Sequence, residues 1–119
     1  MQDETKRIVT SRQAGAVVVE FIDKNLLDEV ALSQIGQQLS DLLTEDTQPL
    51  LVLDFATVAH MSSSALGMLI TFRKRVNQAG GKLCLCNIRP EIHEVFEITK
   101  LTELFEIQPT RIAALASLG

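Results

Sequence analysis

The chain has 119 residues, of which 46% are hydrophobic and 22% charged, and a formal net charge of −4 at pH 7. That composition is typical of one globular domain, so we expect a single domain over residues 1–119 with a frayed tail at 1–6. No apolar run approaches the roughly 20 residues of a membrane-spanning helix, and the polar N-terminus is unlike a signal peptide. We therefore expect a cytoplasmic protein. The acidic balance, with no basic patch beyond residues 73–75, argues against a nucleic-acid partner.

The N-terminal part of the chain predicts a β-hairpin followed by a helix. A short strand is expected at 7–11, a turn at 13–15 and a second, β-branched strand at 16–21. After a polar break at 23–25, Asp28 can cap a helix over 29–43. Its apolar residues, Val30 and Leu32 among them, recur mostly at helical spacing and are expected to face the core. Residues 44–49 are expected to form a loop.

The stretch from residue 50 to 76 carries the clearest pattern in the sequence. Four apolar residues closed by Asp54 predict a buried strand, and a short loop then ends in Ser62, Ser63 and Ser64. Serine is among the best N-cap residues because its hydroxyl accepts a hydrogen bond from a first-turn N–H group. We therefore expect a helix to begin at the serines, at the place where an α/β domain exposes side chains and free N–H groups together.

The residues that follow the serines support this helix along its whole length. Apolar residues recur in steps of three or four from Ala65 to Val76, and Leu66 and Ile70 widen the stripe that we expect to be buried. The cations at 73–75 are expected in the last turn, where positive charge suits the helix dipole. The sequence at 79–81 then predicts the end of the helix.

The C-terminal part predicts two more strands and two more helices. A strand is expected at 82–86, then a short helix at 91–99 that begins near Pro90 and turns Ile92, Val95 and Phe96 inward. A last strand is expected at 104–107. A final helix at 111–118 is expected to bury Ile112, Leu115 and Ala116. A hairpin followed by alternating strands and helices favours an α/β fold with a mixed sheet.

Several residues capable of chemistry are present, but none forms a pattern that requires catalysis, a metal or a cofactor. Cys84 and Cys86 share one face of a predicted strand and are expected to be buried, reduced thiols. His60 and His93 lie far apart, with no carboxylates at metal-ligand spacing. Asp54 ends a strand, as a phospho-accepting aspartate would, but no neighbouring acidic pair accompanies it. We therefore expect a structural or loop-orienting role for Asp54.

The central stretch resembles a known family. Leu53-Asp54-Phe55, followed by Val58 and by Met61-Ser62-Ser63-Ser64-Ala65-Leu66-Gly67, is similar to the signature of STAS domains, which include anti-sigma-factor antagonists and the cytoplasmic tails of sulfate transporters. The later run from Leu85 to Ile92, with Phe96, Leu101 and 105–107, also resembles the family. The resemblance covers roughly residues 8–118. It implies a STAS-type mixed sheet with packed helices.

The resemblance also implies a phosphorylation switch. In the bacterial antagonists, a partner that is both kinase and anti-sigma factor phosphorylates the first serine after an aspartate, and a phosphatase restores the complex. The matching residue here is Ser63, with Ser62 and Ser64 as alternatives. Two positions depart from the pattern, because Ser62 replaces the family's aspartate and Ala65 replaces its glycine. On the residues alone, a helix cap is the favoured interpretation of the serines.

We therefore expect a non-enzymatic, anti-sigma-factor-antagonist-like module without cofactor or metal. Its partners would be an anti-sigma factor that is a serine kinase of the histidine-kinase-like ATPase type, and a serine phosphatase. The alternative is a STAS adaptor that is not phosphorylated and serves a membrane transport complex. The expected partner-binding residues are Asp23, Asp28, His60, Met61, Ser62, Ser63, Ser64, Ala65, Leu66 and Gly67.

Overall fold

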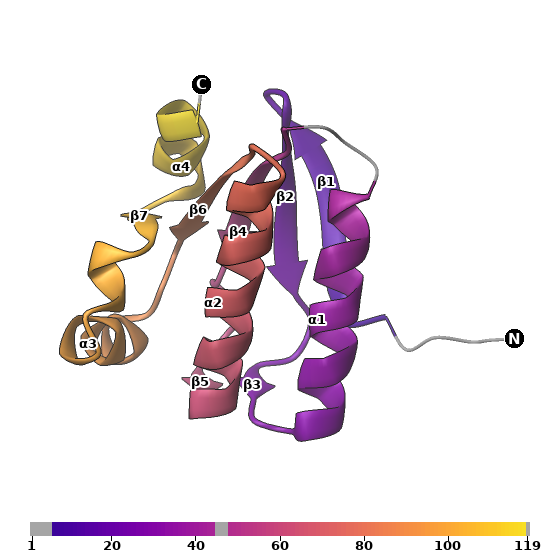
Figure 1. Cartoon of the computed structure of the whole chain (residues 1–119). Helices are drawn as coiled ribbons and strands as arrows, with labels where there is room; N and C mark the ends of the chain where they lie inside the picture. Colours follow the sequence, from indigo (N-terminus) through magenta and orange to yellow (C-terminus); the bar gives the residue numbers. More distant parts are fainter. Residues whose placement is uncertain (1–5, 45–47, 119) are drawn as a thin grey trace, which may run out of the picture.

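The computed structural model describes residues 6–44 and 48–118 and is built around one five-stranded sheet (Figure 1). The strand order is β1-β2-β4-β6-β7. Strands β1 and β2 are antiparallel, and each of the other neighbouring pairs is parallel. This is the α/β fold with an opening hairpin that the sequence predicts. The strands are β1 (Ile8–Gln13), β2 (Ala16–Phe21), β4 (Leu50–Asp54), β6 (Lys82–Cys86) and β7 (Glu106–Gln108).

The helices divide the core into two parts. Helices α1, α2 and α3 contribute to a large apolar core on one face of the sheet, where Val19 and Leu53 are fully buried. Helix α4 covers a smaller cluster on the other face, which contains Val18, Cys84 and Cys86. The helices are α1 (Glu29–Leu43), α2 (Ser63–Gln78), α3 (Pro90–Ile98), the short 3₁₀ helix η1 (Leu101–Glu103) and α4 (Arg111–Leu118).

The predicted elements of the N-terminal half are confirmed closely. The hairpin turns at Ala14 and Gly15, both at positive φ (52° and 83°), which is the geometry that suits the twist of a two-residue hairpin turn. The β2 strand and the α1 helix have the expected bounds, and the Asp28 carboxylate caps α1 by accepting from the Ala31 N–H at 2.9 Å. Residues 45–47 of the expected 44–49 loop and residues 1–5 of the expected tail lie outside the described residues.

Helix α2 begins and ends where the sequence predicts, but its outer face differs. Its buried residues, Ala65, Leu69, Phe72 and Val76, are the predicted stripe. The expectation that Ile70 extends this stripe is wrong, since 38% of it is exposed. The expectation that the three cations share the last turn is also wrong, because α2 runs on to Gln78 and leaves only Arg75 there.

The C-terminal elements need more correction. The last strand begins at Glu106 rather than at residue 104, because η1 and the following turn take up residues 101–105. Helix α4 has the predicted bounds but buries Ala114 and Leu118, while Ile112 is 81% exposed and Ala116 is also exposed. The Arg111 side chain reaches back to the sheet, where it contacts Asp54 and Glu20.

Two more apolar side chains that were expected to face the core are exposed. Val30 is 62% exposed and Val95 42% exposed. Both lie next to positions that do face inward, Ala31 and Phe96, and a helix brings only one stripe to the core. Within the described residues, no helix is long and apolar enough to cross a membrane.

Candidate functional site

The serines occupy the start of α2 in three different ways. Ser62 is the N-cap residue, with extended backbone (φ −90°, ψ 170°) and an Oγ that accepts from the Ala65 N–H at 3.2 Å. Ser63 and Ser64 are the first two helical residues, and both are exposed. Because N–H groups of a first turn lack partners within the helix, positive partial charge lies beside these two hydroxyls. The capping role thus belongs to Ser62 and leaves the Ser63 hydroxyl outside it.

A second, very small sheet holds the serine loop against the connector between β2 and α1. Strand β3 (Asn25–Leu26) pairs in parallel with β5 (His60–Met61). The Ser62 N–H donates to the Leu26 carbonyl at 3.0 Å, and the Ala59 N–H to the Lys24 carbonyl at 2.7 Å. The His60 ring Nδ1 lies 2.8 Å from the Asn25 Oδ1. Neither of these two-residue strands was predicted, because two residues are too short to show alternation.

This pairing brings the predicted partner-binding residues of both loops to one end of the molecule. Asp28 caps α1, and Asp23 forms an ion pair with Arg7 at 3.0 Å, so both carboxylates also have structural partners. His60 and Gly67 are exposed, and Met61 and Leu66 are half-buried. Ala65 is fully buried, so the expectation that its side chain contacts a partner is not supported by this geometry.

Sequence reasoning missed the apolar residues at this end. Ile22 and Leu27, on the connector between β2 and α1, are 48% and 50% exposed, and Val30 follows on the first turn of α1. Exposed apolar side chains that form a contiguous patch mark interaction sites more often than isolated ones do. We define the serine surface by the half-buried Met61 together with the exposed residues Ile22, Leu27, Val30, His60, Ser63, Ser64 and Gly67.

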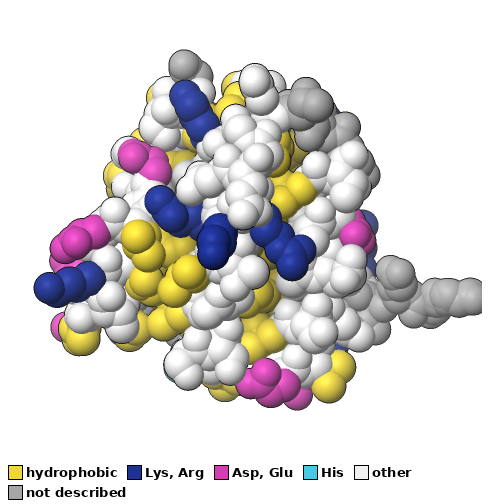
Figure 2. All heavy atoms as spheres, in the orientation of Figure 1, with side chains coloured by type: hydrophobic (Ala, Val, Ile, Leu, Met, Phe, Trp, Pro, Cys, Tyr) yellow, Lys and Arg dark blue, Asp and Glu magenta, His cyan; other side chains and the backbone are white. Residues whose placement is uncertain are grey.

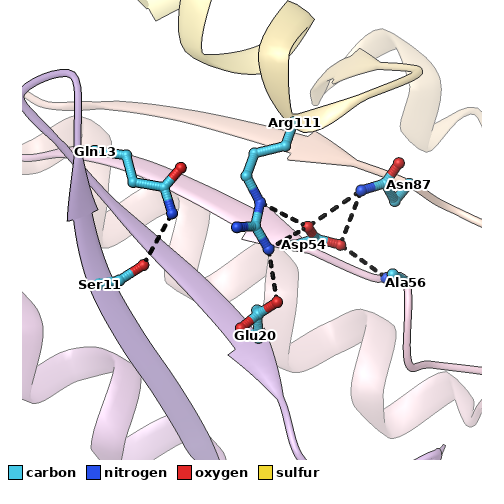
Figure 3. A network of polar contacts seen from close by, with 7 residues as sticks. All are labelled: Ser11, Gln13, Glu20, Asp54, Ala56, Asn87 and Arg111. Atoms are coloured by element: carbon cyan, nitrogen blue, oxygen red, sulfur yellow. Dashed lines mark hydrogen bonds and ion pairs between the residues drawn. The ribbon is translucent and has the colours of Figure 1, made fainter.

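A different polar cluster lies where β4 ends, and this one is closed. Asp54 is the one charged residue that is buried within the described chain, at 3% exposure. Its carboxylate accepts from the Ala56 N–H at 2.9 Å and from the Asn87 amide at 3.1 Å (Figure 3). Arg111, from α4, donates to it through Nε at 3.0 Å and Nη2 at 2.8 Å. The Arg111 Nη2 also lies 2.6 Å from Glu20.

The Asp54 cluster connects four segments of the chain: β2 through Glu20, the end of β4, the residue Asn87 after β6, and α4 through Arg111. The two hydrogen bonds with Asp54 and the contact with Glu20 raise the pKa of Arg111, so this guanidinium stays charged. Both Asp54 oxygens have donors, which leaves the carboxylate no free lone pair aimed at solvent. The loop-orienting role expected for Asp54 agrees with its bond to Ala56. Arg111 was not singled out in the sequence because 57 residues separate it from Asp54.

The two cysteines are unsuited to chemistry in this structure. Both are free and fully buried under α4. Burial, aided by the nearby negative charge of Asp54, raises the pKa of the Cys86 thiol to about 12. Burial also raises the pKa of Cys84, although a hydrogen bond with Ser117 opposes this. Among residues 6–44 and 48–118, no three His, Cys, Asp or Glu side chains are grouped to hold a metal ion.

Comparison with known proteins agrees with the fold. Residues 7–114 match the model of the STAS domain family, so the chain belongs to this family. The computed structure is similar to that of an anti-sigma-factor antagonist (STAS) domain protein from Planctomyces limnophilus, with a TM-score of 0.84 and 23% identity over 93% of this chain and 97% of that one. This likeness is one of fold.

Two relatives of this chain have names that describe them as antagonists of anti-sigma factors. The chain is 25% identical over 112 residues to the anti-sigma F factor antagonist of Paenibacillus polymyxa, which covers 94% of each. It is 35% identical over 66 residues to BtrV of Bordetella bronchiseptica, described as a candidate anti-sigma factor antagonist. That second match covers 56% of this chain and 57% of BtrV, so it spans little more than half of the relative.

Proposed function

We propose that this chain is an anti-sigma factor antagonist that binds an anti-sigma factor through the serine surface and is released by phosphorylation of Ser63. The observation that carries the proposal is that two neighbouring serines at the start of α2 have different roles. Ser62 caps the helix, while the Ser63 hydroxyl is exposed one residue later and has no part in the cap. A kinase can therefore modify Ser63 without removing a bond that the fold uses.

The same geometry explains how a phosphate would act. At the N-terminus of a helix a phosphate is stabilised by the free N–H groups and the dipole, so the domain stays folded. A partner packed on Ile22, Leu27 and Val30 would instead meet a hydrated dianion beside an apolar contact. A loss of roughly 3–4 kcal/mol in binding free energy weakens a complex by several hundred-fold. Binding can thus be switched without a change of conformation.

The proposed partner is an anti-sigma factor that is also a serine kinase of the histidine-kinase-like ATPase type, and a serine phosphatase would reverse the modification. Support comes from the family membership and from the names of the two relatives. In this proposal the module acts in the cytoplasm by binding and has no catalytic role of its own. Ser64, also exposed, is the alternative acceptor, and Ser62 the less suitable one because its hydroxyl already accepts a hydrogen bond.

The test is a capture experiment from native cell extract with wild-type and Ser63→Asp baits. Ser11→Asp is the matched control, because it places the same charge on an exposed serine of β1. We expect wild type and Ser11→Asp to retain an ATPase-type kinase that Ser63→Asp loses. The captured kinase with ATP should then phosphorylate wild type at Ser63, located by peptide mass spectrometry, and leave Ser63→Ala unmodified.

Two outcomes would overturn the proposal. If the Ser63→Asp bait retains the same partners as wild type, Ser63 is not the switch. If those shared partners are the components of a membrane transport complex, the chain is a STAS adaptor that needs no phosphorylation.

A further inference from the structure

The face of the molecule formed by α2 and its neighbours carries a row of basic side chains next to exposed apolar side chains (Figure 2). We call Arg73, Lys74 and Arg75 the basic patch. Arg73, Lys74 and Arg75 are consecutive, so their side chains leave α2 in different directions. Arg73 reaches the Leu104 carbonyl, with its Nε at 2.6 Å, and Arg75 reaches the Ser40 hydroxyl on α1 at 3.0 Å. The basic patch thus crosses α2, from the segment that follows η1 to helix α1.

Neither the helix dipole nor ion pairing within the described residues accounts for the whole basic patch. Arg75 lies in the last turn of α2, where it suits the helix dipole, but Arg73 and Lys74 lie before that turn. Within residues 6–44 and 48–118, no ion pair involves any of the three cations. The chain as a whole has a net charge of −4, so three consecutive cations without an ion pair among the described residues are unusual on this surface.

Apolar surface lies beside the basic patch, on the side nearer the start of α2. Ile70 is 38% exposed and Leu104 is 42% exposed, and the Arg73 bond to Leu104 brings their two segments side by side. Leu66, one turn before Ile70, is half-buried, and a yellow area in Figure 2 covers the region between α2 and η1. A groove of about 510 Å³ continues between the C-terminal half of α2 and the chain around Leu104 and Phe105.

We propose that this face, defined by Leu66, Ile70, Arg73, Lys74, Arg75 and Leu104, is a docking surface for an acidic amphipathic helix of a protein partner. Charge complementarity selects the acidic occupant, because no ion pair within residues 6–44 and 48–118 involves these three cations, although the net charge of the whole chain is −4. Leu66 and Ile70, one helical turn apart and beside Leu104, suit the apolar stripe of a helix, while the adjoining groove is lined mostly by polar groups. Glu103 and Glu106 also border the groove, so the acids of the partner must face α2.

This surface is separate from the Ser63 switch. Arg73 lies ten positions after Ser63 in α2, a distance of about 15 Å along the helix. Docking here therefore does not require Ser63 to be phosphorylated or free, and the proposal stands whether or not the serine surface binds an anti-sigma factor.

The test is an NMR titration of the isotope-labelled full chain with a synthetic amphipathic peptide of about four helical turns, with Leu on one face and Glu on the other. Its control is the same peptide with Gln for Glu. We expect shifts of amide signals confined to α2 from Leu66 onward and to residues 101–106. Lys74→Gln/Arg75→Gln should weaken binding about three- to tenfold, as for the loss of two exposed ion pairs.

Matched variants separate the surface from general effects. Arg89→Gln removes an exposed cation at the start of α3 and should bind as wild type does. Ile70→Ser should weaken binding, whereas Ile112→Ser, on the far helix α4, should leave it unchanged. Ser63→Asp should bind the Glu peptide like wild type, which keeps this test independent of the proposed switch.

Three results would overturn the proposal. If the Gln peptide binds as tightly as the Glu peptide, or if the Lys74→Gln/Arg75→Gln variant binds the Glu peptide as tightly as wild type does, charge does not select the occupant. If vesicles containing anionic lipid bind more tightly than the Glu peptide through these same residues, the surface is a membrane contact and not a helix-docking site.

Discussion

The chain that leaves β4 passes two polar clusters that differ in almost every respect. The Asp54 cluster is buried, and its carboxylate oxygens are occupied by donors from Ala56, Asn87 and Arg111. The serine surface is open, and the hydroxyls of Ser63 and Ser64 are exposed beside the unpaired N–H groups of a first helical turn. Both clusters follow one strand, yet only the open one can gain a charge and present it to a partner.

The difference shows how a small domain separates stability from regulation. A buried carboxylate is tolerated only when its hydrogen bonds are satisfied, so the Asp54 cluster has little freedom to change. A phosphate on an exposed helix start costs the fold little. Changes at the two clusters should therefore differ mainly in their effect on the free energy of unfolding.

The largest expected effect is that of Arg111→Met. It leaves Asp54 buried without its cation, which should lower the free energy of unfolding by about 3–4 kcal/mol. Urea denaturation followed by circular dichroism measures this change. Glu20→Gln is the control, since it removes only the more exposed partner of Arg111 and should cost less than about 1 kcal/mol. If Arg111→Met lowers the free energy of unfolding by less than about 1 kcal/mol, the interaction of Arg111 with Asp54 contributes little to stability.

The next effect concerns the cap. Ser62→Ala should lower the free energy of unfolding by about 1 kcal/mol, because it removes the acceptor for the Ala65 N–H. Ser62→Asp should retain that bond and the stability. The control is Ser64→Ala, which changes an exposed first-turn residue and should stay within about 0.5 kcal/mol of wild type. Equal costs at residues 62 and 64 would contradict the assignment of Ser62 as the cap.

A smaller effect, of opposite sign, is expected for Ser63→Asp. A negative charge at the first helical position should raise the free energy of unfolding by about 0.3–1 kcal/mol at low ionic strength, and salt should reduce the gain. Chemical denaturation at low and high salt measures both. A destabilised Ser63→Asp variant would imply that a charge here disturbs the fold, and the proposed switch would then act through unfolding rather than through the interface.

The smallest effect near neutral pH is that of the buried thiols. Because the pKa of Cys86 is raised to about 12 in the folded chain, the native thiol keeps its proton when the unfolded one loses it above pH 9. Stability should be insensitive to this group below that pH and should fall as the pH rises further, by up to about 1.4 kcal/mol per unit. Cys86→Ala should flatten the decline. Rapid reaction of the native protein with a thiol reagent would contradict this burial.

Much of this protein follows from the sequence by itself. The strand at 16–21 and the helices at 29–43 and 111–118 were predicted with their observed bounds, because strong periodicity, caps and glycine turns are local signals. The start of α2 at the serines was predicted for the same reason, since an N-cap acts within one helical turn. The resemblance to STAS domains also rests on short local motifs, and the match of residues 7–114 to the family model confirms the family.

Only the tertiary structure decided what depends on residues far apart in the chain. The pairing of Asn25 with His60 and of Arg111 with Asp54 joins segments 35 and 57 residues apart, and no local pattern encodes either contact. Helix α4 packs on the sheet through Ala114 and Leu118, so Ile112 is exposed instead of buried. Periodicity states that a helix has an apolar stripe, but the surface against which it packs decides which side chains remain free for partners.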